Sequence, residues 1–189
     1  CYAATAWADR NAEAIGGLDG GVAVGGTSAG ATLSAGVSLM ARDFAQVGEA
    51  GVPDIAFQWL VYPAANVRET FDSYSENGEG YFLERETSRW FRDQYYERPM
   101  DRFHPYAAPL EARDVSGLPP ATVVTAEFDP LRDEGRAHAE RMREAGVEVT
   151  HRHYDGMIHG FFGMLGLSAS ADCIDATSGD LRETMVGNG

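Results

Sequence analysis

Lysine is absent from this sequence, and cysteine is rare. All 15 basic residues of the 189-residue chain are arginine, and the two cysteines are Cys1 and Cys173. Neither lies in a C-x-x-C pair or a Cys/His cluster, and two thiols cannot supply a disulfide framework. We therefore expect two ordinary thiols and no metal site.

Long apolar runs are also missing. No stretch approaches the roughly 18 uninterrupted apolar residues of a membrane span, which excludes a bilayer-embedded protein but not a peripheral contact. The hydrophobic fraction of 44% suits one globular domain with a sizeable core. No charged-then-apolar leader follows Cys1, so any signal peptide would lie upstream. The sequence does not fix the cellular compartment, and we expect the cytoplasm.

Positive charge is scarce. Against 29 acidic residues, the 15 arginines leave a formal net charge of -14. Such a chain repels phosphate backbones, which argues against a nucleic-acid partner and against adsorption to anionic membranes. A GC-rich genome would explain the missing lysines, and adaptation to salt is our hypothesis for the acidic excess.

Strand-like and helix-like segments alternate along the chain. The predicted strands are 22–24, 56–62, 121–126 and 147–153, and the predicted helices are 3–15, 29–44, 130–145 and 168–185, with a turn over 16–21. This alternation predicts an α/β fold with a mostly parallel sheet and helices on both faces.

One interval breaks the alternation. Residues 66–116 are charged and aromatic and too long for a simple crossover, which indicates a helical insertion over the sheet. We expect core segments at 1–65 and 105–189, with the insertion at 66–104 between them.

The pentapeptide Gly-Thr-Ser-Ala-Gly at residues 26–30 follows the first predicted strand and opens the next helix. A G-x-S-x-G match alone is weak evidence, but this context is that of a sharp turn presenting a serine nucleophile. The Ala29 amide would then face a developing oxyanion. The alternative is a glycine-rich turn that caps the helix or binds an anion.

A nucleophilic serine needs a base, and the chain has five histidines. His138 falls within a predicted helix, and His151 and His153 fall on or beside a strand. His104 precedes a proline at the end of the insertion. His159 follows the last predicted strand, on the side where Ser28 should lie, and is the favoured base.

The acid that orients the base should follow the preceding strand. Asp129 has that position, but Asp before Pro130 is also typical of a helix N-terminus, and position alone cannot separate the two roles. Glu127 and Asp133 are less favoured, because the first belongs to the strand and the second to the helix.

With these sites, the chain resembles the hormone-sensitive-lipase-like family of α/β-hydrolase serine esterases, in its GTSAG branch. The segments that carry the resemblance are 26–31, 60–63, 81–83, 127–135 and 159–161. The resemblance implies a triad of Ser28, Asp129 and His159 and a cap formed by the insertion. It implies hydrolysis of short- to medium-chain carboxylic esters with no metal or organic cofactor.

The sequence departs from that family in two ways. Thr27 stands where many members have aspartate, which we expect to shift substrate preference. The His-Gly-Gly-Gly motif that completes the oxyanion hole in the family does not occur, nor do the first strands and part of the cap. We therefore expect the C-terminal portion of such an enzyme, incomplete as a catalyst when alone.

Tyr81, Phe82, Trp90 and Phe91 are candidates for shaping an acyl pocket, although packing within the cap is the alternative for most of them. The expected partner is a small-molecule ester, and a homodimer is allowed. Two other functions remain open at this point: a small-molecule receptor with this fold, and an amidase or peptidase.

If the acidic excess reflects adaptation to salt, hydrolytic activity should persist from low to molar salt. Ester hydrolysis measured across that range tests this, and inactivation at high salt would contradict it. The control is a lysine-containing esterase with a net charge near zero.

Overall fold

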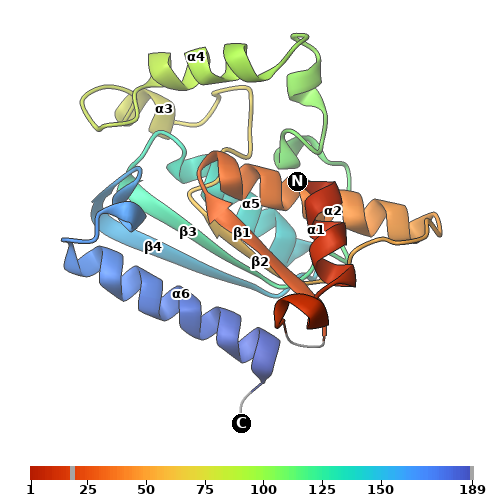
Figure 1. The fold of residues 1–189 in the computed structure, drawn as a ribbon. Coiled ribbons are helices and arrows are strands. Elements are labelled where there is room, and N and C mark those ends of the chain that lie inside the picture. Colours follow the sequence, from red (N-terminus) through yellow and green to blue (C-terminus); the bar gives the residue numbers. More distant parts are fainter. Residues whose placement is uncertain (18–19, 188–189) are drawn as a thin grey trace.

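The computed structural model describes residues 1–17 and 20–187 (Figure 1). In chain order its elements are α1 (Tyr2–Arg10), η1 (Glu13–Ile15), β1 (Val22–Thr27), α2 (Ala29–Gln46), β2 (Ile55–Val61), α3 (Ser73–Glu76), α4 (Arg85–Tyr95), η2 (Asp101–Phe103), η3 (Pro109–Glu111), β3 (Ala121–Phe128), α5 (Arg132–Glu144), β4 (Val149–Ile158), η4 (Phe161–Gly163) and α6 (Ser168–Val186), where η marks a 3-10 helix.

In the part of the chain that the structure describes, the strands form one parallel sheet in the order β1-β2-β3-β4. The α/β class with a parallel sheet and flanking helices is thus confirmed. Because parallel strands all end at the same edge, the residues that follow them gather there. These residues are Ser28, Tyr62, Asp129 and His159.

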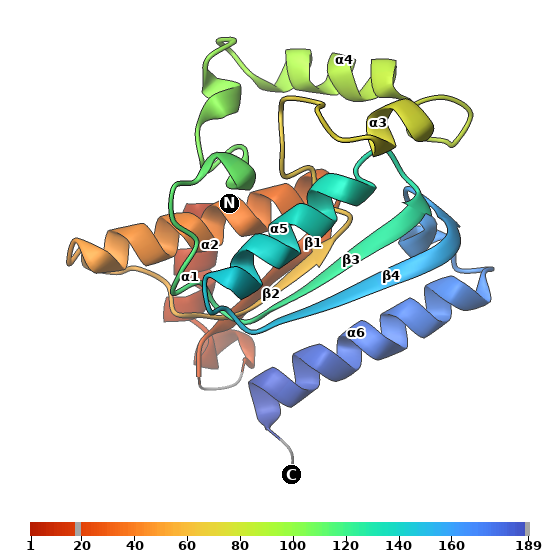
Figure 2. The ribbon, with the colours of Figure 1, turned by 180° about the vertical axis from the view of Figure 1, so that it is seen from behind.

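Helices cover both faces of the sheet. On one face α2 and α5 pack against β2 and β3, and Figure 2 shows α5 in front of the strands. The buried side chains of this layer include Ala35, Leu39, Leu60, Val123 and Met142. On the other face α6 packs through the fully buried Cys173 against Val61, Val124 and Phe161. Two apolar layers therefore hold the strand ends in register.

The N-terminal segment differs from its prediction. The helix expected over 3–15 ends at Arg10, where the Asn11 side-chain amide donates to the Trp7 carbonyl oxygen at 2.7 Å, and a separate 3-10 turn follows. In the predicted turn over 16–21, Gly16 has a φ of 80°, whereas Leu18 and Asp19 lie outside the described residues.

Three strands, β1, β3 and β4, are longer than their apolar runs suggested. β1 continues past Val24 through Gly25 and Gly26, because glycine lets neighbouring groups approach closely: a Cβ at Gly25 would lie 2.8 Å from the Trp59 Cβ. β4 continues to Ile158, with a register shift opposite β3 near its end. His159 therefore follows its strand directly.

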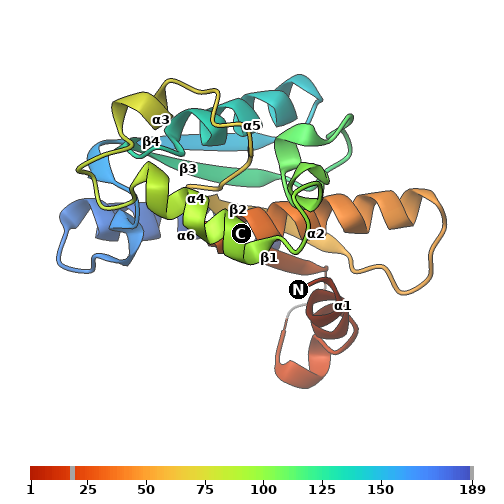
Figure 3. The same cartoon turned by 90° about the horizontal axis from the view of Figure 1, so that it is seen from above.

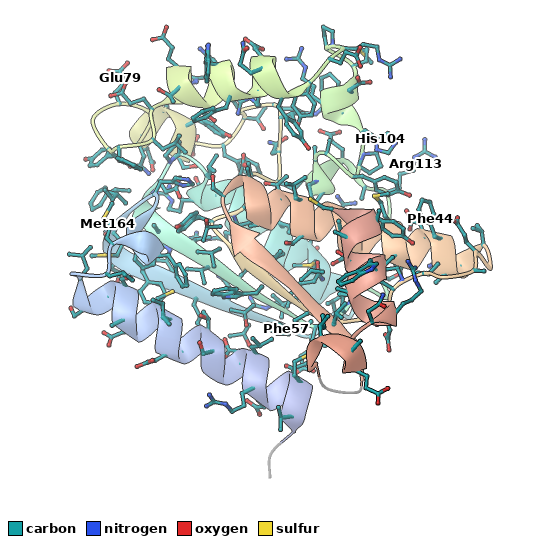
Figure 4. The ribbon with its side chains drawn as sticks, viewed as in Figure 1. Phe44, Phe57, Glu79, His104, Arg113 and Met164 are labelled. Carbon is teal, nitrogen blue, oxygen red and sulfur yellow. The ribbon has the colours of Figure 1, made fainter. Side chains whose placement is uncertain are left out.

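The segment 66–104 passes over the carboxyl ends of the strands and carries α3 and α4 (Figures 1 and 3). It is less helical than expected, since Tyr81 and Phe82 lie outside both helices and Phe82 has a φ of 66°. Figure 4 shows Glu79 beside α3 and His104 at the other end of the segment, near Arg113.

Neither cysteine forms a disulfide: Cys1 is exposed and Cys173 is buried, both as free thiols. Of the helices in residues 1–17 and 20–187, none has the length and apolar character required to cross a membrane.

Gly36 lets α2 approach the loop that carries Tyr106, because a Cβ there would collide with the Tyr106 carbonyl oxygen. We predict that Gly36→Ala lowers the free energy of unfolding by roughly 1–3 kcal/mol. The matched control is Gly179→Ala in α6, where a Cβ meets nothing within 4 Å. That change should raise stability by about 0.5–1 kcal/mol, since alanine favours helix. Urea unfolding measures both, and equal effects would contradict the packing argument.

Candidate active site

Ser28 occupies a strained turn between β1 and α2. Its φ of 53° and ψ of -118° lie where residues with a Cβ are rarely found, so neighbouring contacts must hold the turn. The Ser28 N–H donates to the Val61 carbonyl oxygen at 2.9 Å, which ties the turn to β2. A Cβ at Gly26 would lie 2.8 Å from the Gly30 carbonyl carbon, so the turn also requires a glycine at residue 26.

Ala29 is the first residue of α2, and the N–H of a first helical residue has no acceptor within its own helix. Ala29 is exposed and lines the same cavity as Ser28. A helix N-terminus also carries partial positive charge. This amide can therefore donate to a negatively charged oxygen that forms beside Ser28.

His159 lies between Ser28 and Asp129. Its Nε2 is 3.0 Å from the Ser28 Oγ, and its Nδ1 is 2.7 Å from the Asp129 Oδ2. A carboxylate can only accept, so Nδ1 carries the proton in this pair and Nε2 of the neutral ring is left as an acceptor. In this arrangement the imidazole can take the proton of the Ser28 hydroxyl.

Asp129 uses its two carboxylate oxygens for different purposes. Oδ2 faces His159, while Oδ1 accepts from the Leu131 N–H at 2.8 Å, just before α5 begins. The residue is fully buried, and the Asn77 side chain donates to its carbonyl oxygen at 3.4 Å. Asp129 therefore contacts His159 through one oxygen, whereas the predicted helix cap is wrong: α5 begins only at Arg132, its N-cap is Leu131 with no side-chain cap bond, and the bond from Leu131 closes a local turn.

The two less favoured acids are engaged elsewhere. The Glu127 carboxylate accepts from the Gly156 N–H at 2.6 Å. Asp133 lies on α5 and pairs with Arg132 at 2.7 Å. Neither of these carboxylates contacts His159.

The other four histidines lie in different surroundings. His151 and His153 both lie 2.9 Å from the Thr125 hydroxyl, and His104 packs against the Tyr106 ring. His138 is fully buried in α5, and neither of its ring nitrogens has a hydrogen-bond partner. Burial lowers the pKa of His138 to about 4, so this ring is neutral near pH 7.

Tyr62 supports the histidine and was not identified from the sequence. It has a φ of 40°, and its ring centroid is 4.5 Å from that of His159. Burial raises the pKa of Tyr62 to about 12. The available signal was a tyrosine before Pro63 at the end of a strand, which is typical of a chain turning away from the sheet.

Ser28 and His159 open into a cavity of about 630 Å³ beneath α4. Of the four aromatic residues predicted to line it, Phe82 and Phe91 do so. Tyr81 instead stacks on Phe128, and Trp90 is 58% exposed. The lining also includes residues that the prediction omitted, namely Leu33, Val67, Tyr95, Tyr96 and Tyr106.

A second carboxyl group, Glu134, is fully buried close to Asp129. It accepts from the Tyr74 hydroxyl at 2.9 Å and from the Asn66 N–H at 3.4 Å, so it connects α5 to the segment over the sheet. Burial, which the Asp129 charge reinforces, raises the pKa of Glu134 to about 8. This carboxyl group was also missed, because only the path of residues 66–74 brings its partners to it.

Within residues 1–17 and 20–187, no set of three or more His, Cys, Asp or Glu side chains is arranged to hold a metal ion.

Comparison with protein families matches residues 1–163 to a family described as having the alpha/beta hydrolase fold. The carboxylic ester hydrolase LipN of Mycobacterium tuberculosis is 40% identical over 172 residues, which are 90% of this chain and 45% of LipN. An arylesterase of Saccharolobus solfataricus is 38% identical over 164 residues, which are 86% of this chain and 51% of that protein. The chain thus spans about half the length of these relatives.

Among solved structures, the carboxylesterase EstE1 from a metagenomic library superposes with a TM-score of 0.89 at 36% identity, covering 97% of this chain and 62% of EstE1. A hyperthermophilic esterase of Pyrobaculum calidifontis has a TM-score of 0.88, also at 36% identity, covering 96% of this chain and 59% of that one.

Glu134 should make stability depend on pH. Its pKa is about 8 when folded and near 4.5 when exposed, so the folded state holds a proton that the unfolded chain releases between these values. The stability this provides is present below about pH 4.5 and is lost as pH rises through about 8. Glutamine does not titrate, so the Glu134→Gln variant should not lose this stability. We predict that its free energy of unfolding minus that of wild type increases as pH rises from about 5 to about 8.

Urea unfolding at several pH values measures that difference. The control is Glu140→Gln, an exposed position on the same helix. Its profile should follow wild type, and an identical profile for Glu134→Gln would contradict the prediction. Taking the difference from wild type cancels any contribution from the buried histidines.

Proposed function

The chain belongs to the alpha/beta hydrolase family, in its hormone-sensitive-lipase-like group, and for that reason we propose that it acts as a carboxylic ester hydrolase. One observation carries the proposal: two hydrogen bonds link Ser28, His159 and Asp129 in the order nucleophile, base and acid. The esterase and ester hydrolase names of its relatives support the same reaction.

In this proposal the Ser28 Oγ attacks the ester carbonyl carbon while His159 Nε2 takes the hydroxyl proton. Asp129 holds the imidazole in the required tautomer and stabilises its charged form. The imidazolium then protonates the departing alcohol, and an acyl group remains on Ser28. Water, deprotonated by the same histidine, attacks this acyl group, and the carboxylic acid leaves as the serine recovers its proton.

The negative charge on the carbonyl oxygen needs donors in place before the reaction begins. The Ala29 amide supplies one donor in this proposal. The resemblance assigns further donors to a His-Gly-Gly-Gly motif, which this sequence does not contain. Loss of a single such donor typically costs about 10² to 10³ in turnover, so the chain alone should be a weak catalyst.

Residues 66–104 form the cap in this proposal. Phe82 and Phe91 bound the acyl pocket together with Tyr95, at the end of α4, and Tyr96, which follows it. Phe82 lines the same cavity as Ser28 and His159, and a Cβ at Gly160 would be 3.2 Å from its ring. Family resemblance alone supports short- to medium-chain acyl groups as substrates.

We predict that Ser28→Ala lowers hydrolysis of p-nitrophenyl acetate and butyrate by roughly 10⁴-fold or more in the full-length protein, because the Ser28 hydroxyl is the one within hydrogen-bond distance of His159 among the described residues. Release of p-nitrophenol is the measurement. Retained turnover would refute the role of Ser28.

Two controls separate the other possible functions. A fluorophosphonate should label wild type but not Ser28→Ala, whereas a receptor with an inactive triad would not be labelled. Anilides matched to the esters distinguish an amidase, which would hydrolyse both classes at comparable rates.

A further inference from the structure

A second cleft, of about 330 Å³, lies beside the catalytic cavity and is lined by arginine. Its five arginines are one third of the 15 in the chain, although the net charge of the chain is -14. They are Arg68, Arg85, Arg89, Arg92 and Arg102. Only two acidic residues, Glu69 and Asp93, line the same cleft. Positive charge is therefore concentrated here against the trend of the whole sequence.

Three of these arginines come from one face of α4. Arg85, Arg89 and Arg92 are spaced by four and then three residues, which places their side chains in a row along a helix. Each pairs with Glu69: the distances are 2.7 Å for Arg85 and 2.8 Å for Arg89, and Arg92 makes a close contact. One carboxylate thus serves three guanidinium groups.

Glu69 is held firmly in this position. Its φ of 47° is unfavourable for a residue with a side chain, and its side chain is only 9% exposed. Arg68 pairs with Glu111 instead, at 2.7 Å. Glu69 therefore fixes the three arginines of α4 without neutralising all of their charge.

Arg102 has no carboxylate partner among the described residues. Its guanidinium lies 5.3 Å from the Phe103 ring centroid, and its buried Nε has no hydrogen-bond acceptor. The Nε atom itself is enclosed, so a ligand in the cleft would be met by the terminal nitrogens of this guanidinium, which form no ion pair within the described residues. The chemistry of the cleft thus favours a planar, negatively charged group such as a carboxylate, which guanidinium groups bind in pairs of hydrogen bonds.

The cleft adjoins the cavity that holds Ser28, since Val67 and Arg92 line both. An acyl chain attached to Ser28 that extends beneath α4 would meet the arginines at its far end. We propose that this cleft binds a carboxylate at the far end of the acyl group, so that the preferred substrates are half-esters of dicarboxylic acids. This rests on the proposed ester hydrolysis and adds to it a selection by charge.

The experiment compares two esters of equal chain length in the full-length protein: p-nitrophenyl hexanoate and the mono-p-nitrophenyl ester of adipic acid. Arg102→Gln should lower kcat/KM for the adipate half-ester by about 10- to 100-fold, the loss typical of one charged hydrogen bond. Hydrolysis of the hexanoate ester should stay within about twofold of wild type. Arg89→Gln, which leaves Glu69 two partners, should act in the same direction.

The matched control is Arg98→Gln, since Arg98 lies in the same segment but pairs with Asp101 outside the cleft. It should leave both esters unaffected. An unchanged adipate rate in both cleft variants, or an equal loss for the two esters, would overturn the proposal while hexanoate turnover still supports an esterase.

A binding measurement separates the two proposals if neither ester reacts. Titration calorimetry of Ser28→Ala with adipate should show binding that Arg102→Gln abolishes and that hexanoate does not reproduce. Absence of adipate binding, or equally tight binding of inorganic phosphate, would contradict a carboxylate subsite. Adipate binding without turnover of either ester would retain the subsite and refute the ester hydrolase.

Discussion

The turn at Ser28 is the constraint on which the rest of the site depends. The residue takes a backbone conformation that costs free energy, and it keeps this conformation because its N–H bonds to Val61 and because Gly26 has no side chain. The same turn directs the hydroxyl to His159 and begins the helix whose first amide belongs to Ala29. The position of the Ser28 hydroxyl, its contact with His159 and the exposed first residue of α2 thus follow from one local geometry.

Two buried carboxyl groups beneath the site are in different environments. Asp129 has a histidine and a backbone N–H as partners, which suit an ionised group. Glu134 is equally buried, but its contacts are a tyrosine hydroxyl and one long backbone bond, and its pKa is near 8. Two equally buried neighbours therefore differ in their hydrogen-bond donors, and Glu134 takes up a proton below about pH 8.

Much of the fold could be predicted because apolar runs, glycines and prolines mark the elements directly. Ser28, Asp129 and His159 could be proposed because each follows a strand, and parallel strands end together. The support from Tyr62 could not be predicted, since it depends on a tertiary contact, and the helix cap suggested for Asp129 is replaced by a local turn because α5 begins two residues later than predicted. The first strand was predicted to end at residue 24, because only packing against Trp59 shows why β1 continues through Gly25.

The arginine cleft shows the same limit. The row on α4 is visible as a spacing in the sequence, but Glu69 joins it only because the chain after β2 bends beneath the helix. Sequence pattern can place charges on one face of a helix. It cannot tell which of them a distant residue will neutralise, so the unpaired Arg102 required the structure.

Ser28 and His159 follow β1 and β4, which lie at opposite edges of the described sheet, and 131 residues separate them. The turn at Ser28 can form once β1 and β2 have paired. His159 reaches Ser28 only when β4 has joined the sheet. Contacts this distant in sequence form late in folding. During folding the Ser28 hydroxyl therefore gains its histidine partner only after all four described strands have paired.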